Sequence, residues 1–472
     1  MADWNEQNVR HLLSRAGFGA KPNDVKIFLR KGQLLTVATL VGQSPSKAMG
    51  PGVSDVDANS IAALREWWVR RMVKQSNRRL QEKMVLFWHD HFASQYSVVK
   101  NVKRMALQNR TFRELGLDSF HALVQAITRD GAMLLMLDGK DNRKNNLNEN
   151  YGRELMELFV LGVADANGKP NYTQGDVQEL ARACTGFQVS ATTDLGFLNP
   201  NRFDDGNKTL WAAQPNPDNP NNSPVTGNLG FEDEDGVPFP PTTNVVDILF
   251  AHRDSDNQLT MPRFIGRKLW EWFGYPNPSK TLVDEITSDF RANGFVIRDL
   301  LRSIFLHEEF YSSAAKTSTV KNPCEFSFGA LRALEARTNF DSVHDGLDLM
   351  GMELFEPPTV NGWNQGLAWV STGLFLSRWG IGQELAAGRD PKVFKLILKK
   401  LFDEDGTVEG VVDGLLARLG IADYVPAGAR QALVDYMNDY PGTVDLTDET
   451  YVETKVRGVI ALMLELPEFN IH

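Results

Sequence analysis

Helical periodicity in two long stretches, separated by one polar stretch, constrains the fold of this chain more than any other feature. Apolar residues recur at three- and four-residue spacing from about residue 8 to 186 and again from about residue 245. Between them, residues 187–244 are rich in Asn, Pro, Gly and Asp, which favour turns. We therefore predict an all-α fold, a single large multi-helix body formed by residues 1–186 and 245–472. The long Asn/Pro/Gly-rich insertion has room for a few short strands, near Phe187–Val189 and Phe197.

Individual helices can be predicted in the C-terminal part. The spacing of apolar residues predicts helices at 245–252, 261–273, 282–293, 297–306, 323–338 and 343–350. A chain of 472 residues with 42% hydrophobic residues can bury a large core. We therefore expect these helices to pack on the N-terminal helices as one domain.

Several classes of protein are disfavoured by the composition. No apolar run approaches the roughly 18 residues of a membrane span, so no transmembrane segment is predicted. The N-terminus lacks the pattern of a secretory signal, which favours the cytoplasm for the sequence as written. Cys184 and Cys324 are the only cysteines, too few for a disulfide framework or a thiolate zinc site. No phosphate- or dinucleotide-binding glycine motif occurs, so no nucleotide cofactor is expected.

The charge is distributed unevenly along the chain. Residues 65–113 carry 12 Lys and Arg against 3 Asp and Glu, a balance that could indicate nucleic-acid binding. Six of these cations instead fit the solvated outer face of a helix whose inner face is aromatic. They are Arg65, Arg70, Arg71, Lys74, Arg78 and Arg79. We therefore predict that nucleic acid is not a partner.

The segment Asn148–Gly162 has the most ordered arrangement of polar residues in the chain. Asn148 or Asn150 can serve as N-cap of a helix, and Gly162 can take the left-handed position after its end. One helix face is apolar, and the other carries a stripe of Glu149, Asn150, Arg153, Glu154 and Glu157.

Two carboxylates of this stripe, Glu154 and Glu157, point the same way within one turn. Such a pair can bind a cation or move a proton, so Glu154, Glu157 and Arg153 are the candidate catalytic residues. The alternative is a solvated face with an ion pair between Arg153 and Glu157.

Two histidines lie one residue apart in Trp88–Phe92. Side chains two positions apart on a continuous helix diverge by about 200°, so His89 and His91 cannot chelate one ion together. His91 falls on the apolar face, either as a hydrogen-bonded core histidine or as a buried metal ligand. His89 is predicted to be exposed.

The segment Phe355–Trp369 combines aromatic and amide side chains with prolines and glycines that stiffen it. Such a loop is typical of a wall that binds a small ligand or a saccharide, and Asn361 and Trp363 are its candidate binding residues. A lid that merely packs its aromatic rings is the alternative.

Taken together, several segments in order resemble the domain-of-unknown-function 1800 family. They are His11–Ala20, Trp88–Ala93, Asn142–Lys144 with Asn148–Gly162, Tyr172–Gly186, Phe264–Phe273, Lys321–Leu334 and Leu349–Trp363. The resemblance implies a helical protein of a widespread bacterial group whose members are often exported. It also implies a partner of the 1501 family, which is similar to sulfatases and alkaline phosphatases. No settled activity comes with the resemblance.

The chain departs from this family in one segment. Many members place a His-Asp-x-Gly-x-Lys segment after the long loop, where this sequence has Asn228–Gly236 and no histidine. The carboxylates of Glu232–Asp235 are then the alternative donors.

Two functions are expected from these residues. In the first, a divalent metal, Zn, Mn or Fe, is held by His91, Glu154, Glu157 and Glu149, with Asn150 and Arg153 around it. The protein would then be a metal-dependent hydrolase acting with a sulfatase- or phosphatase-like partner. In the second, the same polar residues form a buried salt-bridge network, and the protein is a non-catalytic scaffold or accessory protein.

Overall fold

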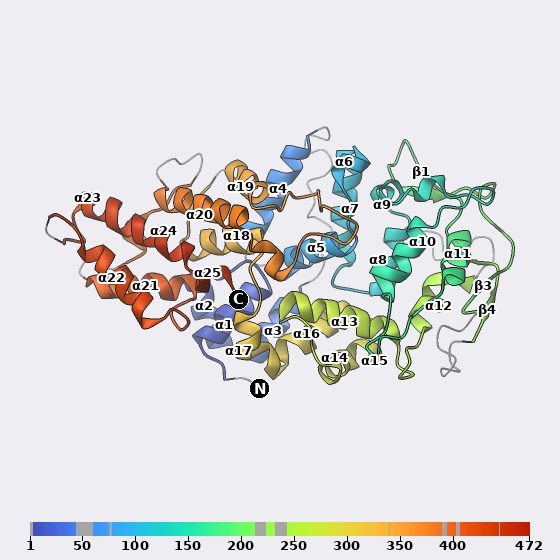
Figure 1. Ribbon diagram of the computed structural model, residues 1–472, viewed down its shortest axis with the longest axis horizontal. Helices are drawn as coiled ribbons and strands as arrows, with labels where there is room; N and C mark the ends of the chain where they lie inside the picture. Colours follow the sequence, from blue (N-terminus) through green and yellow to red (C-terminus); the bar gives the residue numbers. More distant parts are fainter. Residues whose placement is uncertain are drawn as a thin grey trace.

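The computed structural model describes residues 3–43, 60–74, 78–212, 223–231, 243–338, 340–388, 394–402, 406–442 and 444–472. The carboxylates of Glu232–Asp235 therefore lie outside the described residues. Figure 1 shows an elongated molecule, with the last helices of the chain at one end and both chain ends near the middle. No helix within the described ranges has the length and apolar character that a membrane span requires.

The first part of the chain is helical, as predicted, and local sequence explains where several helices begin. Asn101 and Ser119 accept backbone N–H groups at the starts of α7 and α8, and Thr173 and Asp176 form a capping box at the start of α11. The elements are α1 (Glu6–Arg15), α2 (Pro22–Lys31), α3 (Gln33–Val41), α4 (Ile61–Lys74), α5 (Arg79–His91), α6 (Tyr96–Val99), α7 (Val102–Leu115), α8 (Phe120–Thr128), α9 (Gly131–Met136), η2 (Gly139–Asp141), α10 (Asn150–Glu154), η3 (Leu155–Val160) and α11 (Gln174–Ala183).

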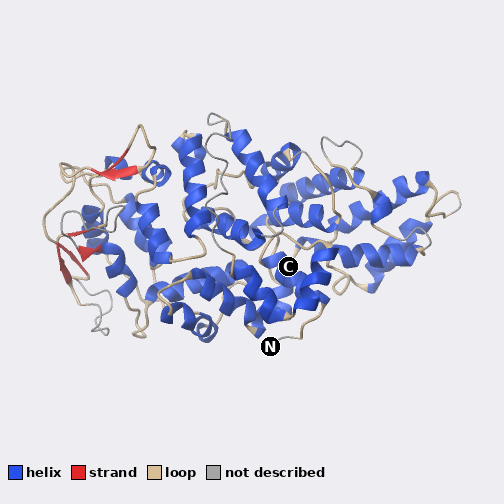
Figure 2. Ribbon diagram, turned by 180° about the vertical axis from the view of Figure 1, so that it is seen from behind, coloured by secondary structure: helices blue, strands red, loops and turns tan. Residues whose placement is uncertain are grey.

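The polar insertion contributes the named strands of the described chain, which lie at one end of the molecule in Figure 2. Strand β1 pairs with β2 and β3 with β4 in antiparallel ladders, whereas β5 and β6 are parallel. The predicted strands near residues 187–189 and 197 are confirmed as the β1–β2 pair. The strands are β1 (Phe187–Val189), β2 (Gly196–Leu198), β3 (Lys208–Leu210), β4 (Val225–Gly227), β5 (Leu229–Gly230) and β6 (Thr243–Asn244).

The C-terminal part is again helical. Its elements are α12 (Val245–Ala251), α13 (Thr260–Phe273), α14 (Lys280–Ile286), α15 (Ser288–Ala292), α16 (Ile297–Leu306), η4 (Glu308–Tyr311), α17 (Ser313–Thr317), α18 (Pro323–Ala333), α19 (Asp341–Leu349), η5 (Gly366–Trp369), α20 (Thr372–Ala387), η6 (Leu398–Lys400), α21 (Val408–Leu419), α22 (Ala427–Asn438), α23 (Glu449–Tyr451), η7 (Val452–Val456), α24 (Arg457–Glu465) and α25 (Pro467–Asn470).

The single helix predicted at 282–293 is wrong, because the chain breaks into α14 and α15 at Thr287. The Thr287 side chain packs so closely on α13 that a Cβ added at Gly266 would lie 2.3 Å from its methyl group. The Thr287 hydroxyl also donates to the carbonyl of Val283 at 2.7 Å. This back-bonding is a known cause of helix distortion.

A hydrophobic cluster extends from Leu12 in α1 to Phe469 in α25 and includes residues from both helical parts. Helix α3 packs against α16, and α18 packs against α4, so helices far apart in the sequence share this core. The boundaries of the insertion at 186 and 244 stay a prediction.

Helix α5 lies inside this core and is buried on every side. All of its residues except Asp90 are buried, including the charged residues Arg79, Glu82 and Lys83. Glu82 accepts hydrogen bonds from Arg71 at 2.9 Å and from Arg113 at 2.9 Å, and Lys83 forms an ion pair with Glu325. Buried charges require such partners, because water cannot solvate them.

The predicted solvated face of basic residues is therefore partly wrong. Arg65, Arg71 and Arg79 are buried rather than exposed. Arg71 pairs with Glu82, and Arg79 pairs with Asp24 at 3.2 Å. The physical reason is that α4 and α5 pack inside the body, where carboxylates replace water as partners of the cations.

Candidate functional site

The segment Asn148–Gly162 forms the short helix α10, which continues without a break into the π-helix η3. The N-cap position falls on Glu149, although Asn148 Oδ1 still accepts the backbone N–H of Asn150 at 2.9 Å. Gly162 has a φ of 80°, the left-handed conformation predicted for it. The π-helix was not predicted, and π-turns are frequent at functional sites.

The polar stripe divides into two groups. In the first, Glu149 Oε2 accepts hydrogen bonds from Arg153 at 2.8 Å and from Gln174 at 2.8 Å. The ion pair of Arg153 is therefore formed with Glu149, not with Glu157 as the alternative interpretation had it. Asn150 is exposed and donates to Asp138 at 3.5 Å.

The second group consists of Glu154, Glu157 and Tyr172. Glu157 Oε2 accepts the hydroxyl of Tyr172 at 3.0 Å. Burial and then the negative charge of Glu157 raise the pKa of Glu154. The two carboxylates are thus electrostatic neighbours, and both are half-buried.

His91 is buried, and both of its ring nitrogens have partners. Nε2 lies 3.1 Å from the carbonyl of Phe159, and Nδ1 lies 3.3 Å from Lys268 Nζ. Because the carbonyl only accepts, Nε2 carries the proton, and Nδ1 accepts from the ammonium group of Lys268. Burial and the Lys268 charge hold the pKa of His91 well below its usual value, so the ring is neutral.

These contacts cap the C-terminal end of the segment. Lys268 also donates to the carbonyl of Leu158 at 3.3 Å, and Asn171 donates to that of Leu161 at 2.9 Å. The last carbonyls of a helix lack partners within it, and a cation there also interacts favourably with the helix dipole. His91, Lys268 and Asn171 therefore hold the end of η3 in place.

Asp90 extends this cluster, and its role was not predicted. Its Oδ1 accepts the backbone N–H of Trp363 at 2.6 Å, and its Oδ2 accepts the amide of Gln365 at 3.1 Å. Burial raises the pKa of Asp90 to about 7, although these bonds and the Lys268 charge favour the carboxylate. Asp90 thus ties the segment Phe355–Trp369 to the end of α5.

The predicted exposure of His89 is wrong, because its side chain is 0% exposed. Its ring packs against those of Trp68, Phe355 and Trp363. Burial lowers the pKa of His89 to about 3. His89 and His91 therefore lie in separate environments, as the geometry of a continuous helix requires.

The two candidate binding residues of Phe355–Trp369 differ in their exposure to solvent. Asn361 is exposed at a turn, whereas Trp363 is buried with its ring against His89. Phe355 and Trp369 are also buried. The aromatic rings of this segment thus pack inward on α4 and α5.

The predicted metal ligands do not converge on one point. The carboxylates of Glu149 and Glu157 bond to other side chains, and both nitrogens of His91 are engaged. In the part of the chain that the structure describes, no group of three or more His, Cys, Asp or Glu is arranged to hold a metal ion. The residues present therefore do not fit a three-ligand metal centre.

A second set of long-range contacts holds the C-terminal end of α13, the helix that carries Lys268. Arg15 of α1 donates to the carbonyls of Phe273 at 2.6 Å, Trp272 at 3.1 Å and Gly274 at 3.0 Å. Arg15 is 1% exposed, so these carbonyls have little access to water. Lys268 thus ties the middle of α13 to η3, and Arg15 caps its C-terminal end.

The fold and these contacts define a class: an all-α protein whose distant helices are joined by buried ion pairs and charged helix caps. The chain belongs to the family described as protein of unknown function (DUF1800), whose model matches residues 11–471. The resemblance noted in the sequence is therefore confirmed over nearly the whole chain. No curated protein and no solved structure matches it.

Proposed function

We propose that this protein is a non-catalytic scaffold or accessory protein whose helical body is tied together by buried charged contacts. The observation that carries this proposal is the use of His91, whose two ring nitrogens bond to Phe159 and Lys268. A metal ligand or a general base needs one of these nitrogens free. The polar residues of α5, η3 and α13 are thus engaged in joining three helices.

The buried ion pairs support the same proposal. Glu82 with its two arginines, and Lys83 with Glu325, lie on α5 and reach α4, α7 and α18. Buried pairs of this kind are costly to form but can specify one arrangement of helices.

The partner expected for an accessory protein is the sulfatase- or phosphatase-like member of the 1501 family. Support for a partner surface comes from apolar side chains that η5 and α20 leave in water. Leu367 is 81% exposed, Leu376 is 58% exposed and Trp379 is 37% exposed. Exposed apolar side chains gathered on neighbouring elements are typical of interaction sites.

A metal-dependent hydrolase is the second candidate. The observation in its favour is that, after burial, the charge of Glu157 raises the pKa of Glu154, as expected of two carboxylates that could share a cation or a proton. Zn, Mn or Fe would then be held by this pair without His91.

One experiment separates the two proposals. Wild type, His91→Ala and Glu154→Gln are purified without chelator, and metal content and urea unfolding are measured. His121→Ala is the matched control, because His121 is a part-exposed histidine paired with Asp247. For a scaffold we expect no stoichiometric metal, and a loss of about 1–3 kcal/mol in His91→Ala because Phe159 loses its donor.

A metal-dependent hydrolase would give a different result. Stoichiometric Zn, Mn or Fe in wild type that disappears in Glu154→Gln would overturn the scaffold proposal and support the hydrolase. The partner is tested in the same series by co-purification with the 1501-family protein, which Leu367→Ser should weaken if the exposed apolar surface binds it.

A further inference from the structure

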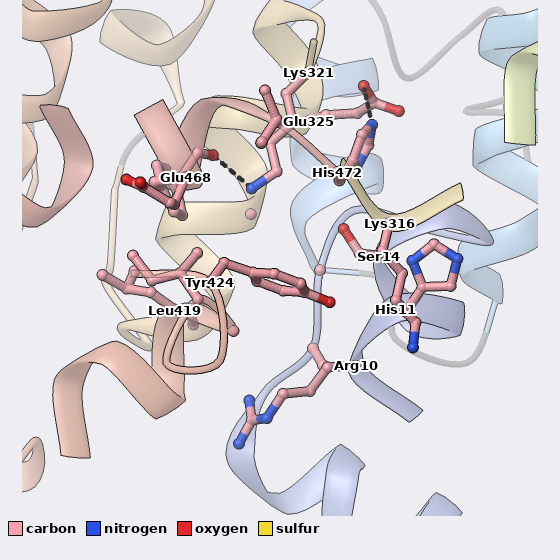
Figure 3. A pocket seen from close by; sticks show the side chains of 18 of the residues that line it. Arg10, His11, Ser14, Lys316, Lys321, Glu325, Leu419, Tyr424, Glu468 and His472 are labelled. Carbon is pink, nitrogen blue, oxygen red and sulfur yellow. Dashed lines mark hydrogen bonds and ion pairs between the residues drawn. The ribbon is translucent and has the colours of Figure 1, made fainter. Parts of the chain in front are cut away.

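A cavity of about 70 Å³ lies outside the His91 cluster, where α1, α17 and α18 meet the loop after α21 and the C-terminal residues. Figure 3 shows the Tyr424 ring extending from the α21 side toward Ser14 on α1. Such a volume holds several water molecules or one compact ligand. The proposed function makes no use of this cavity.

Four cations line the cavity. Among the described residues, Arg10 and Arg418 form only long ion pairs, and Lys316 and Lys321 form none. Lys316 donates to the amide oxygen of Gln7 at 3.2 Å, and Lys321 donates to the carbonyl of Phe469 at 2.6 Å. Arg10 donates to the carbonyl of Arg418 at 3.4 Å. These acceptors are neutral, so these hydrogen bonds do not themselves offset the positive charges.

The nearest acids are at the outer limit of ion pairing. Arg10 lies 4.0 Å from Glu6, and Arg418 lies 3.8 Å from Glu335. Burial lowers the pKa of Arg10, and the positive charge of Arg418 adds to this effect against the negative charges of Glu6 and Asp423. The two arginines, which both line the cavity, therefore repel each other.

Lys321 is also buried near other positive charges. Burial, opposed by the charge of Glu325 and assisted by those of Arg378 and Arg15, lowers the pKa of Lys321 to about 7. An anion in the cavity would relieve this repulsion.

Glu325, Glu468 and Asp423 also belong to this region and offset part of its positive charge. Glu325 is already paired with the buried Lys83, and it accepts the backbone N–H of Asn322 at 2.9 Å. Glu468 lines the cavity with one carboxylate oxygen that has no partner. Burial lowers the pKa of Lys316, and the charge of Asp423 opposes this shift.

His472 presents a free nitrogen to the cavity. Its Nε2 lies 3.2 Å from Glu325 Oε2, while its Nδ1 is buried and has no hydrogen-bond partner. The side chain is 6% exposed, and burial lowers the pKa of His472 to about 3. A neutral ring therefore leaves Nδ1 without a partner, and a bound anion would raise the pKa of His472, favour the protonated ring and accept the Nδ1–H.

We propose that this cavity binds a compact oxyanion, the phosphate or carboxylate group of a small ligand, between Arg10, Lys316, Lys321 and Arg418. His472 closes the inner end of the site, and the hydroxyls of Ser14 and Tyr424 line it. Charge-assisted hydrogen bonds from Arg and Lys are the usual means of holding such groups.

Calorimetric titration of the full chain with inorganic phosphate and, separately, with acetate tests the proposal. We expect saturable binding of at least one anion at low salt. Arg10→Gln and Lys316→Gln should each weaken it by about tenfold, the effect of one charged hydrogen bond. Arg110→Gln is the matched control, because Arg110 also pairs with a glutamate one turn away but lies on α7.

Each result of these titrations either supports or overturns the proposed anion site. A preference for phosphate identifies a phosphate group as the ligand's anionic part, and a preference for acetate identifies a carboxylate. Binding of neither anion would overturn the proposal, as would equal affinity in Arg10→Gln, Lys316→Gln and wild type. Circular dichroism of each variant shows whether it is folded, and His472→Gln gives a further variant that leaves the cations in place.

Discussion

Gly362 lies directly against the carboxylate of Asp90, so closely that a Cβ added at Gly362 would be 2.3 Å from Asp90 Oδ1. Gly362 also has a φ of 90°, which side chains rarely adopt. This turn brings the backbone N–H of Trp363 to the same carboxylate oxygen. The contact therefore needs both the missing side chain and the left-handed backbone.

Gly362→Ala should accordingly destabilise the protein by about 3 kcal/mol, through backbone strain and the collision with Asp90. Urea unfolding measures the loss. Gly294→Ala is the control, because Gly294 has a φ of 73° but no atom within 4 Å of an added Cβ. It should cost only about 1 kcal/mol, for the backbone alone. Equal losses in the two variants would show that the Asp90 contact contributes nothing.

The raised pKa of Asp90 predicts a dependence of stability on pH. In the unfolded chain an aspartate titrates near pH 4, whereas burial raises the pKa of Asp90 to about 7. The folded protein thus binds this proton more tightly, and the stability it contributes is present below about pH 4 and lost as the pH rises through about 7.

Asp90→Asn removes this titration. Relative to wild type, the variant should gain stability steadily between about pH 4 and pH 7, as measured by urea unfolding across that range. Asp141→Asn replaces an exposed aspartate and should run parallel to wild type. A constant difference between Asp90→Asn and wild type over this range would contradict the prediction.

The buried pair of Lys83 and Glu325 predicts a strong interaction between two substitutions. Lys83→Met alone leaves the Glu325 carboxylate without its closest cation and should cost about 3–5 kcal/mol. Adding Glu325→Gln should recover most of this loss. Arg70→Met, which breaks an exposed pair with Glu66, should cost less than about 1 kcal/mol. If the loss of stability in the double variant equalled the sum of the losses in the two single variants, residues 83 and 325 would not be coupled.

Amphipathic spacing predicted much of the fold. The helix expected at 297–306 matches α16, and Gly162 ends the Asn148–Gly162 segment as expected. These features depend on neighbours in the sequence, so local pattern is sufficient to find them. The break at Thr287 was missed because it depends on close packing against Gly266, which lies on another helix.

The site was less predictable for the same reason. Lys268 meets His91 across 177 residues, and Asp90 meets Trp363 across 273 residues. The spacing of residues within one helix gives no indication of contacts between segments so far apart in the sequence. The exposure of His89 was misjudged because the two-faced helix assumed for α5 is in fact surrounded on every side.

The contacts of α1 have a consequence for how this chain can fold. Arg15 precedes its acceptor Phe273 by 258 residues, and His11 bonds to the carbonyl of Phe310 across 299 residues. During synthesis on the ribosome, α1 therefore emerges long before the segments that satisfy it. Contacts between segments so far apart in the sequence form slowly, and apolar faces that stay exposed meanwhile promote aggregation. We expect this helix to dock late, and chaperones to matter more for this chain than for an all-α protein built from local contacts.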